Sequence, residues 1–167
     1  MDPELIKSRH EQVQRHINWL RIQVSKIVEV PHRLELLDNQ SLSDFRIIVG
    51  KRTFYVSKSF LSMKSEVFKK MFESGMKETH EGQLVLHDDE EAVEAMLFFI
   101  YGDKKIEDLN LAMKVIQLAH RYGIELLKLQ CEYLIVQNLT LDLACDSLVM
   151  SKRLDLPYLA LKCYEMG

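Results

Sequence analysis

The sequence predicts an α+β fold, in which a small three-stranded sheet is followed by a cluster of helices. Two strand-like runs, Phe45–Val49 and Thr53–Val56, flank a two-residue Gly50-Lys51 turn, which is typical of a hairpin. Leu84–Leu86 forms a third short apolar run, and most of the chain after it has apolar residues at helical spacing. Strands followed by a run of helices indicate the α+β class.

The chain begins with a segment that the pattern predicts to be one helix over residues 5–30. Asp2 and Pro3 supply an N-cap and a first-turn proline, and Pro31 ends the helix. Its apolar seam has alternating spacings of three and four residues, as in a heptad repeat. The seam consists of Ile6, His10, Val13, Ile17, Leu20, Val24 and Ile27. Two alternatives follow: the helix packs on its own domain, or Val13, Ile17, Leu20 and Val24 bind a second copy or another protein.

The later helices are predicted from apolar spacing and from residues that begin or end helices. Short helical runs surround Phe60–Met63 and Val67–Phe72, the second of which ends at Gly75. Asp89 and Asp108 are expected to cap two longer helices. We expect three more helices, over Ile124–Leu139, over Leu141–Met150 and from Pro157 onward.

Composition and charge exclude several classes of function. The 167 residues are 47% hydrophobic and 28% charged, which is typical of a globular protein, and the net charge of −3 disfavours binding to nucleic acid. No apolar stretch reaches the roughly 18 residues of a membrane span, and the N-terminus lacks the apolar core of a signal peptide. The three cysteines form no Cys-x-x-Cys pair, so we expect buried free thiols and an intracellular protein.

No motif in the sequence indicates catalysis. It lacks a glycine-rich phosphate loop, a His-Glu-x-x-His zinc motif and a Gly-x-Ser-x-Gly nucleophile motif. The acidic run Glu78–Glu94 also contains His80 and His87, but acidic residues at helix starts are usually solvated. We therefore expect no enzyme activity, no metal and no cofactor.

Several spaced motifs, in the right order, resemble the BTB/POZ family. Ser43-Asp44 stands before the first strand, as the family's opening Ser-Asp or Thr-Asp does. Phe54–Leu61 resembles the Phe-x-x-His-Lys-x-x-Leu segment, with Ser57 in place of the histidine. Ser65–Phe72 resembles the family's Ser-x-x-Phe-x-x-Met-Phe, and Phe99-Ile100-Tyr101 its Phe-x-Tyr. The resemblance implies a BTB/POZ fold with an extra long N-terminal helix and a C-terminal helix pair.

Within this family, the chain is most similar to the MATH-BTB adaptors of the speckle-type POZ kind. The heptad helix, residues 1–31, stands where those adaptors carry their MATH domain. Residues 32–138 then resemble the BTB/POZ domain, and residues 139–167 resemble the three-box, the start of a BACK-like helix pair. Met76-Lys77-Glu78 resembles the family's cullin motif, a hydrophobic residue, any residue, then Glu, in a loop after the third helix.

The resemblance implies a substrate adaptor of a cullin-3 RING ubiquitin ligase. A cullin-3-type scaffold would contact Met71, Met76 and Glu78, and residues 5–30 would recruit an unidentified substrate. The domain would form a homodimer through a surface that also includes an Asp–Lys pair. The dimer positions are Leu34, Leu37, Asp44, Lys58 and Phe60. The alternative is a scaffold or transcriptional oligomerisation module without cullin binding.

Overall fold

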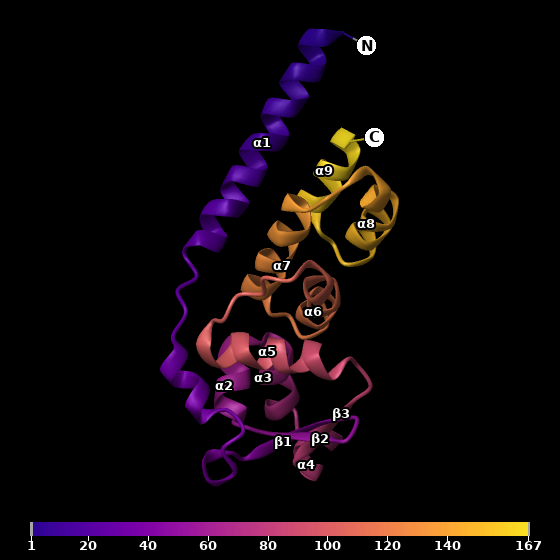
Figure 1. The fold of residues 1–167 in the computed structure, drawn as a ribbon. Helices are drawn as coiled ribbons and strands as arrows, with labels where there is room; N and C mark the ends of the chain where they lie inside the picture. The colour runs from indigo at the N-terminus through magenta and orange to yellow at the C-terminus, as the bar shows by residue number, and fades with distance from the viewer. Residues whose placement is uncertain (1, 167) are drawn as a thin grey trace.

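The computed structural model describes residues 2–166 and contains a three-stranded sheet, as predicted. Strand β1 (Phe45–Val49) lies in the centre, antiparallel to β2 (Arg52–Val56) and parallel to β3 (Gln83–Leu86). The side chains of Phe45, Ile47 and Val49 alternate into the core, because successive residues of a strand point to opposite faces. Figure 1 shows the sheet at one end of the molecule, with the helices stacked away from it.

Two of the helices begin at the capping residues that the sequence predicts. Asp89 Oδ1 accepts a hydrogen bond from Ala92 N at 3.1 Å, and Asp108 Oδ2 accepts one from Leu111 N at 2.8 Å. These bonds satisfy amides that have no partner inside the helix. The helices are α2 (Lys58–Lys64), α3 (Glu66–Glu73), α4 (Lys77–Glu81), α5 (Glu90–Gly102), α6 (Leu109–Arg121), α7 (Glu125–Gln137), α8 (Leu141–Arg153) and α9 (Pro157–Met166).

Helix α1 (Pro3–Ser25) is shorter than the predicted helix, which was expected to continue to residue 30. After Ser25 the chain becomes extended, so that Val30 N donates to Gly102 O at 2.8 Å before the 3₁₀ helix η1 (Pro31–Leu36) begins. The early end of α1 follows from this tertiary contact with the end of α5. A second 3₁₀ turn, η2 (Gln40–Leu42), leads into β1.

Helix α1 packs on α7 and α9 of its own chain, as the first alternative predicted. Val13, Leu20 and Val24 are buried there, and Ile17 is partly buried against the same core. In this structure Leu20 and Val24 are therefore internal contacts, which favours the first alternative for this part of the seam. Nearer the N-terminus, Ile6 stays exposed.

The described residues also test two further predictions, one about membrane-spanning helices and one about the cysteines. None of the helices within residues 2–166 is both long enough and apolar enough to cross a bilayer. Cys131 and Cys163 are buried free thiols, but the prediction is wrong for Cys145, which is exposed on α8. The spacing of apolar residues placed Cys145 near the packed face, whereas Ala144 and Ser147 occupy that face.

Candidate functional site

The first candidate surface is formed by η1 and α2, and it includes the predicted dimer positions. Leu34 of η1 and Leu37, which follows η1, are partly buried, and Leu34 packs against Gly102 of α5. A Cβ atom at Gly102 would lie 2.9 Å from Leu34 Cδ2, so the glycine allows this close approach. We call this region the η1–α2 surface, comprising Leu34, Leu36, Leu37, Leu42, Phe60 and Met63.

Phe60 is held on this surface by an aromatic stack. Its ring lies 4.6 Å from the ring of Tyr101, centroid to centroid, with an interplanar angle of 9°. The Tyr101 hydroxyl oxygen accepts a hydrogen bond from Ser57 N at 2.8 Å. Burial raises the pKa of Tyr101, and the nearby charge of Asp44 adds to that rise, so the hydroxyl stays protonated. One face of the Phe60 ring thus packs on Tyr101, and only its other face is available to a partner.

The predicted charged pair of Asp44 and Lys58 does not form within one chain. Asp44 Oδ1 instead accepts a hydrogen bond from the backbone N of Lys58 at 2.8 Å, at the start of α2. The Lys58 ammonium lies 5.8 Å from the centroid of the Phe72 ring. Because a carboxylate near a helix N-terminus satisfies an otherwise unpaired amide, the local role of Asp44 is capping.

Three exposed apolar residues on the η1–α2 surface are not among the predicted dimer positions. Met63 and Leu42 expose 60% and 61% of their surface, and Leu36 is also exposed. Leu36 and Leu42 lie in the short 3₁₀ turns η1 and η2, which give no helical period in the sequence, whereas Met63 lies in α2. Exposed apolar side chains that gather on a surface indicate a contact site.

The second candidate surface surrounds Met76, which the structure places at the N-cap of α4 rather than in an irregular loop. Met76 is 50% exposed and Glu78 lies partly exposed in the first turn. Met71 is only 8% exposed and belongs to the core. Its prediction as a cullin contact is wrong, because α3 turns this side chain inward. We call Met76, Glu78 and His80 the α4 surface.

Backbone acceptors in α3 hold α4 in place. Thr79 Oγ1 donates to Met71 O at 2.9 Å, and Ser74 Oγ donates to the same oxygen at 3.2 Å. Gly82 ends α4 in the left-handed region, with φ of 70°. Met71 therefore supports the α4 surface from below, through its backbone and its buried side chain.

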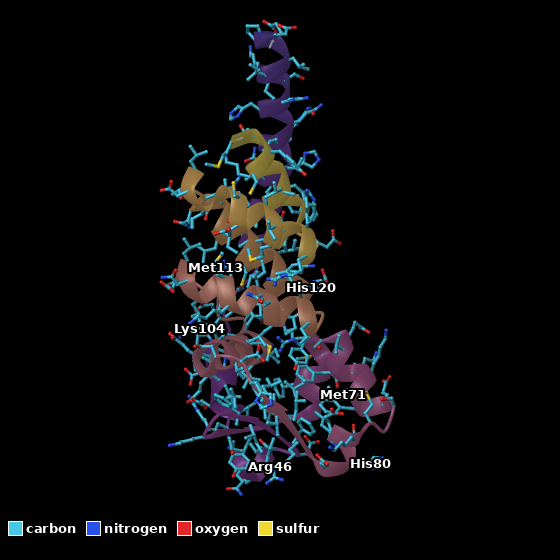
Figure 2. The ribbon with its side chains drawn as sticks, turned by 90° about the vertical axis from the view of Figure 1, so that its right-hand side faces the viewer. Arg46, Met71, His80, Lys104, Met113 and His120 are labelled. Atoms are coloured by element: carbon cyan, nitrogen blue, oxygen red, sulfur yellow. The ribbon has the colours of Figure 1, made fainter. Side chains whose placement is uncertain are left out.

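Tyr122 and an ion pair that the sequence analysis missed adjoin the α4 surface. Arg121 Nη1 and Nη2 donate to Asp88 Oδ1 and Oδ2 at 2.7 and 3.0 Å. Burial raises the pKa of Tyr122, and the carboxylates of Asp88 and Glu78 raise it further. The charge of Glu78 thus acts on Tyr122 from a partly exposed position. Figure 2 shows Met71, His80 and His120 on this side of the molecule.

The C-terminal helix pair lies towards the opposite end of the molecule from α4 (Figure 1). Leu141 and Val149 of α8 are exposed. In Figure 1, α8 lies to the right of α7 and α9, whereas α1 lies to their left. Helix α1 thus covers one flank of α9 and leaves α8 open.

The acidic run predicted to be solvated is largely engaged in ion pairs. Asp89 Oδ2 lies 3.3 Å from Lys114 Nζ, and Glu94 pairs with Arg52 of β2. Within the part of the chain that the structure describes, no three His, Cys, Asp or Glu side chains are grouped to hold a metal ion. The run tethers α5 to its neighbours, and its role is structural.

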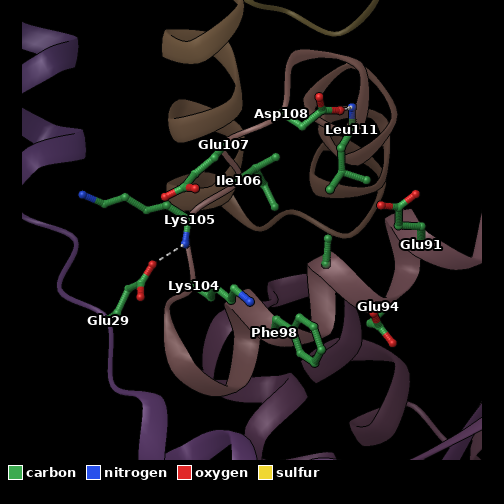
Figure 3. A pocket seen from close by; sticks show the side chains of 11 residues that line it. Glu29, Glu91, Glu94, Phe98, Lys104, Lys105, Ile106, Glu107, Asp108 and Leu111 are labelled. Atoms are coloured by element: carbon green, nitrogen blue, oxygen red, sulfur yellow. Dashed lines mark hydrogen bonds between the residues drawn. The ribbon is translucent and has the colours of Figure 1, made fainter.

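A pocket of about 390 Å³ lies between α5 and the segment before α6 (Figure 3). Its base contains Ala95 and Ile106, which are buried, and Phe98, which is covered by the Lys104 ammonium at 5.1 Å from the ring centroid. Glu29 closes one side by accepting a hydrogen bond from Lys105 N at 3.4 Å. The lining residues offer no nucleophile with a neighbouring base, so the pocket carries no catalytic arrangement.

Glu132 is a buried carboxylate that the sequence analysis did not select. It projects from α7 and accepts hydrogen bonds from Tyr158 N and Leu159 N, both at 3.2 Å, at the start of α9. Burial raises the pKa of Glu132 to about 7, against the lowering effect of these two amides. An acid inside an otherwise apolar helical pattern is the signal that would have identified it.

Comparisons with known proteins agree with the fold. The BTB/POZ domain model matches residues 34–139. The mouse (Mus musculus) "TD and POZ domain-containing protein 5" is 32% identical over 120 residues, which are 70% of this chain and 35% of that protein. "TD and POZ domain-containing protein 3", also from mouse, is 31% identical over 120 residues, 70% of this chain and 33% of that protein. The chain spans about a third of the length of these relatives.

A solved structure gives the same fold. The BTB domain of zebrafish PATZ1 aligns with a TM-score of 0.53 and 23% identity, over 60% of this chain and 80% of that one. The chain therefore belongs to the BTB/POZ family, whose domain is a module for protein–protein interaction.

Proposed function

We propose that this chain is a homodimerising substrate adaptor of a cullin-3-type ubiquitin ligase. The observation that carries the proposal is the half-exposed Met76 beside Glu78 on the α4 surface. An adaptable thioether side chain beside a carboxylate gives an apolar contact with an anionic rim, as in many interface anchors. Such an adaptor positions the substrate for ubiquitin transfer and does not itself catalyse a chemical step.

The η1–α2 surface supports the homodimer part of the proposal. Leu42 and Met63 are exposed on the surface that holds Leu34, Leu37 and Phe60. Burial of apolar area releases about 25 cal/mol per Å², so these side chains favour self-association. In a dimer, Asp44 and Lys58 could also reach their counterparts across the interface. Two substrate sites on one dimer would raise avidity through effective concentration.

A binding assay with the N-terminal region of cullin-3 tests the proposal directly. The double variant Met76→Asp/Glu78→Lys changes both anchors. It places a charge in the apolar contact and replaces the negative charge of Glu78 with a positive one. We expect this variant to bind at least about 30-fold more weakly than the wild type, because loss of an interface anchor costs about 2 kcal/mol or more. Titration calorimetry or surface plasmon resonance measures the ratio.

The variant Val28→Asp/Glu29→Lys is the matched control. It makes the same two kinds of substitution, an exposed apolar residue to Asp and an adjacent acid to Lys, on the segment after α1. This control should bind like the wild type. Equal binding by all three proteins, or no binding by the wild type, would contradict the adaptor role.

The second candidate function is a scaffold that self-associates without a cullin. It is favoured by the exposed apolar residues of the η1–α2 surface, which need no ligase. Deletion of residues 1–30 is a poor test, because it would uncover α7 and α9. The variant Leu42→Asp/Met63→Asp is sharper. Light scattering should show the wild type at twice the 19.6 kDa chain mass and this variant at the single mass. A dimer that binds no cullin would favour the scaffold.

A further inference from the structure

A hollow larger than the pocket beside α5 lies at the end opposite the sheet, between the first half of α1 and the end of α9. This groove has a volume of about 990 Å³. Its apolar wall contains Ile6 and Val13 from α1 and Leu161 and Tyr164 from α9. We call it the α1–α9 groove; neither candidate surface described above includes it.

The heptad seam of α1 explains why the groove is open. Towards the C-terminal end of α1, Leu20 and Val24 are buried against α7 and α9. Towards the N-terminus the same seam continues to Ile6, which is 49% exposed, and Tyr164 opposite it is 59% exposed. From residue 3 to residue 16 the helix rises about 20 Å, the length of about two heptads. The groove, whose lining on α1 runs from Pro3 to His16, is therefore long enough to hold one further helix.

The rim of the groove is positively charged. Glu165 is its one acidic lining residue among residues 2–166, and it is paired with His10 and, at 3.3 Å, with Lys162 Nζ. Burial alone would raise the pKa of Glu165, but the hydrogen bond from His10 and the charge of Lys162 outweigh it and lower the pKa. Within the described residues, Lys7 and Arg9 form no ion pair. The rim therefore presents two cations whose charge is not compensated.

We propose that the α1–α9 groove binds an amphipathic helix of a partner protein, one whose apolar stripe is flanked by Asp and Glu. The stripe would cover Ile6, Val13 and Tyr164, and its acidic flank would meet Lys7 and Arg9. A second copy of this chain fits poorly, because it would bring the same cations to the rim. A flat anionic membrane also fits poorly, because the apolar wall is concave and runs along a helix axis. The groove thus recruits a protein that carries such a helix.

Two fluorescent peptides of two heptads each, cross-linked to stabilise the helix, are suitable probes. Both carry Leu at the a and d positions, and they differ only in having Glu or Lys at e and g. With the wild-type chain we expect the acidic peptide to bind at least about tenfold more tightly than the basic one, since complementary charge selects the partner. Fluorescence anisotropy measures both affinities, and their ratio should fall as salt is added.

Charge exchange on the rim tests the assignment of residues. Lys7→Glu/Arg9→Glu should reverse the preference, and Ile6→Asp should weaken both peptides at least about tenfold, since an apolar anchor is lost. Arg15→Glu/Arg21→Glu is the matched control, because it makes the same charge change on exposed residues of α1 outside the groove. It should leave the preference unchanged. All these positions are exposed, and circular dichroism checks that the variants remain folded.

Equal affinity for both peptides, or a preference that Lys7→Glu/Arg9→Glu does not change, would overturn the proposal. So would concentration-dependent self-association abolished by Ile6→Asp, which would assign the groove to a second copy. Binding to phosphatidylserine vesicles without peptide binding would assign it to a membrane. The peptide assay needs neither dimer nor cullin, so its failure is distinguishable from failure at the α4 surface.

Discussion

The sheet end and the α1 end of this molecule have different kinds of core. At the sheet end the largest buried side chains are aromatic, namely Phe54, Phe68, Phe99 and Tyr101. At the α1 end, helices α7 and α8 bury polar groups as well as apolar ones. The buried polar residues are Gln130, Glu132, Ser147 and Ser151. The sheet end is thus held by close apolar packing, whereas the α1 end depends also on hydrogen bonds at helix ends.

Surface properties follow the same division. The η1–α2 and α4 surfaces rest on the aromatic core, which gives their exposed side chains a rigid base. The α1–α9 groove lies where α1 extends past α9 (Figure 1), and there Ile6 of the apolar seam is exposed. One heptad pattern therefore has two outcomes. Its residues pack internally where α7 and α9 cover α1, and they stay exposed where these helices no longer cover it.

The largest expected effect comes from the aromatic core. Phe68 is fully buried and stacks on Tyr122 with ring centroids 4.5 Å apart. Phe68→Ala should lower the free energy of unfolding by about 3–5 kcal/mol, through lost transfer energy and a cavity. The exposed neighbour substitution Val67→Ala is the control and should cost less than about 1 kcal/mol. Urea unfolding followed by circular dichroism measures both.

Leu20→Ala gives the matching measurement at the α1 end. Leu20 is fully buried between α1 and its neighbours, and its truncation should cost about 2–4 kcal/mol. Hydrogen exchange should show faster opening in α1, α7 and α9 and little change in the sheet. Faster exchange throughout the chain would mean that the two ends unfold as one unit, which would break the comparison.

The next effect concerns pH and is specific to Glu132. Its pKa is raised to about 7 in the folded chain, whereas an unfolded Glu titrates near 4.5. Between these values only the folded state holds the proton, so the free energy of unfolding should fall as pH rises from about 4.5 to about 7 and then level off. The total loss should be about 1–3 kcal/mol, given the measured range for buried carboxyls.

Glu132→Gln removes this titration while keeping an oxygen that accepts from Tyr158 N and Leu159 N. The variant should lose the decline with pH and should be the more stable protein above pH of about 7. Glu125→Gln, an exposed acid on the same helix, should keep the wild-type profile. Parallel profiles for wild type and Glu132→Gln would show that Glu132 does not titrate in this range.

The smallest effect is expected at the ion pair between Arg121 and Asp88. Both groups are partly exposed, so the pair should contribute only about 0.2–1 kcal/mol despite its two hydrogen bonds. Asp88→Asn and Arg121→Gln, with their double variant, give the coupling energy by thermal unfolding. A coupling well above 1 kcal/mol would mean that this pair belongs to the buried cluster around Tyr122.

Features set by a few neighbouring residues were predictable. The strands were correct to within a residue or so because alternation and the Gly50-Lys51 turn are local signals. Caps at Asp89 and Asp108 were correct for the same reason. The end of α1 was not, because Val30 leaves the helix to reach Gly102, seventy-two positions further along the sequence.

Exposure of individual site residues was harder to predict. Met71 and Met76 are five positions apart and chemically identical, yet α3 directs the first inward while the second caps α4 at the surface. Asp44 and Lys58 have opposite charges, but the nearest donor to Asp44 is the backbone amide of Lys58. Each outcome depends on the direction of a helix relative to the core, which spacing alone does not contain.

The sequence by itself determined the family, the class of fold and most helix and strand positions, because these depend on periodicity, capping and ordered motifs. Only the tertiary structure decided which apolar residues stay exposed, that the seam of α1 packs on α7 and α9, and that Glu132 meets the start of α9. The physical reason is that burial depends on what covers a side chain. For these residues the covering groups come from distant parts of the chain.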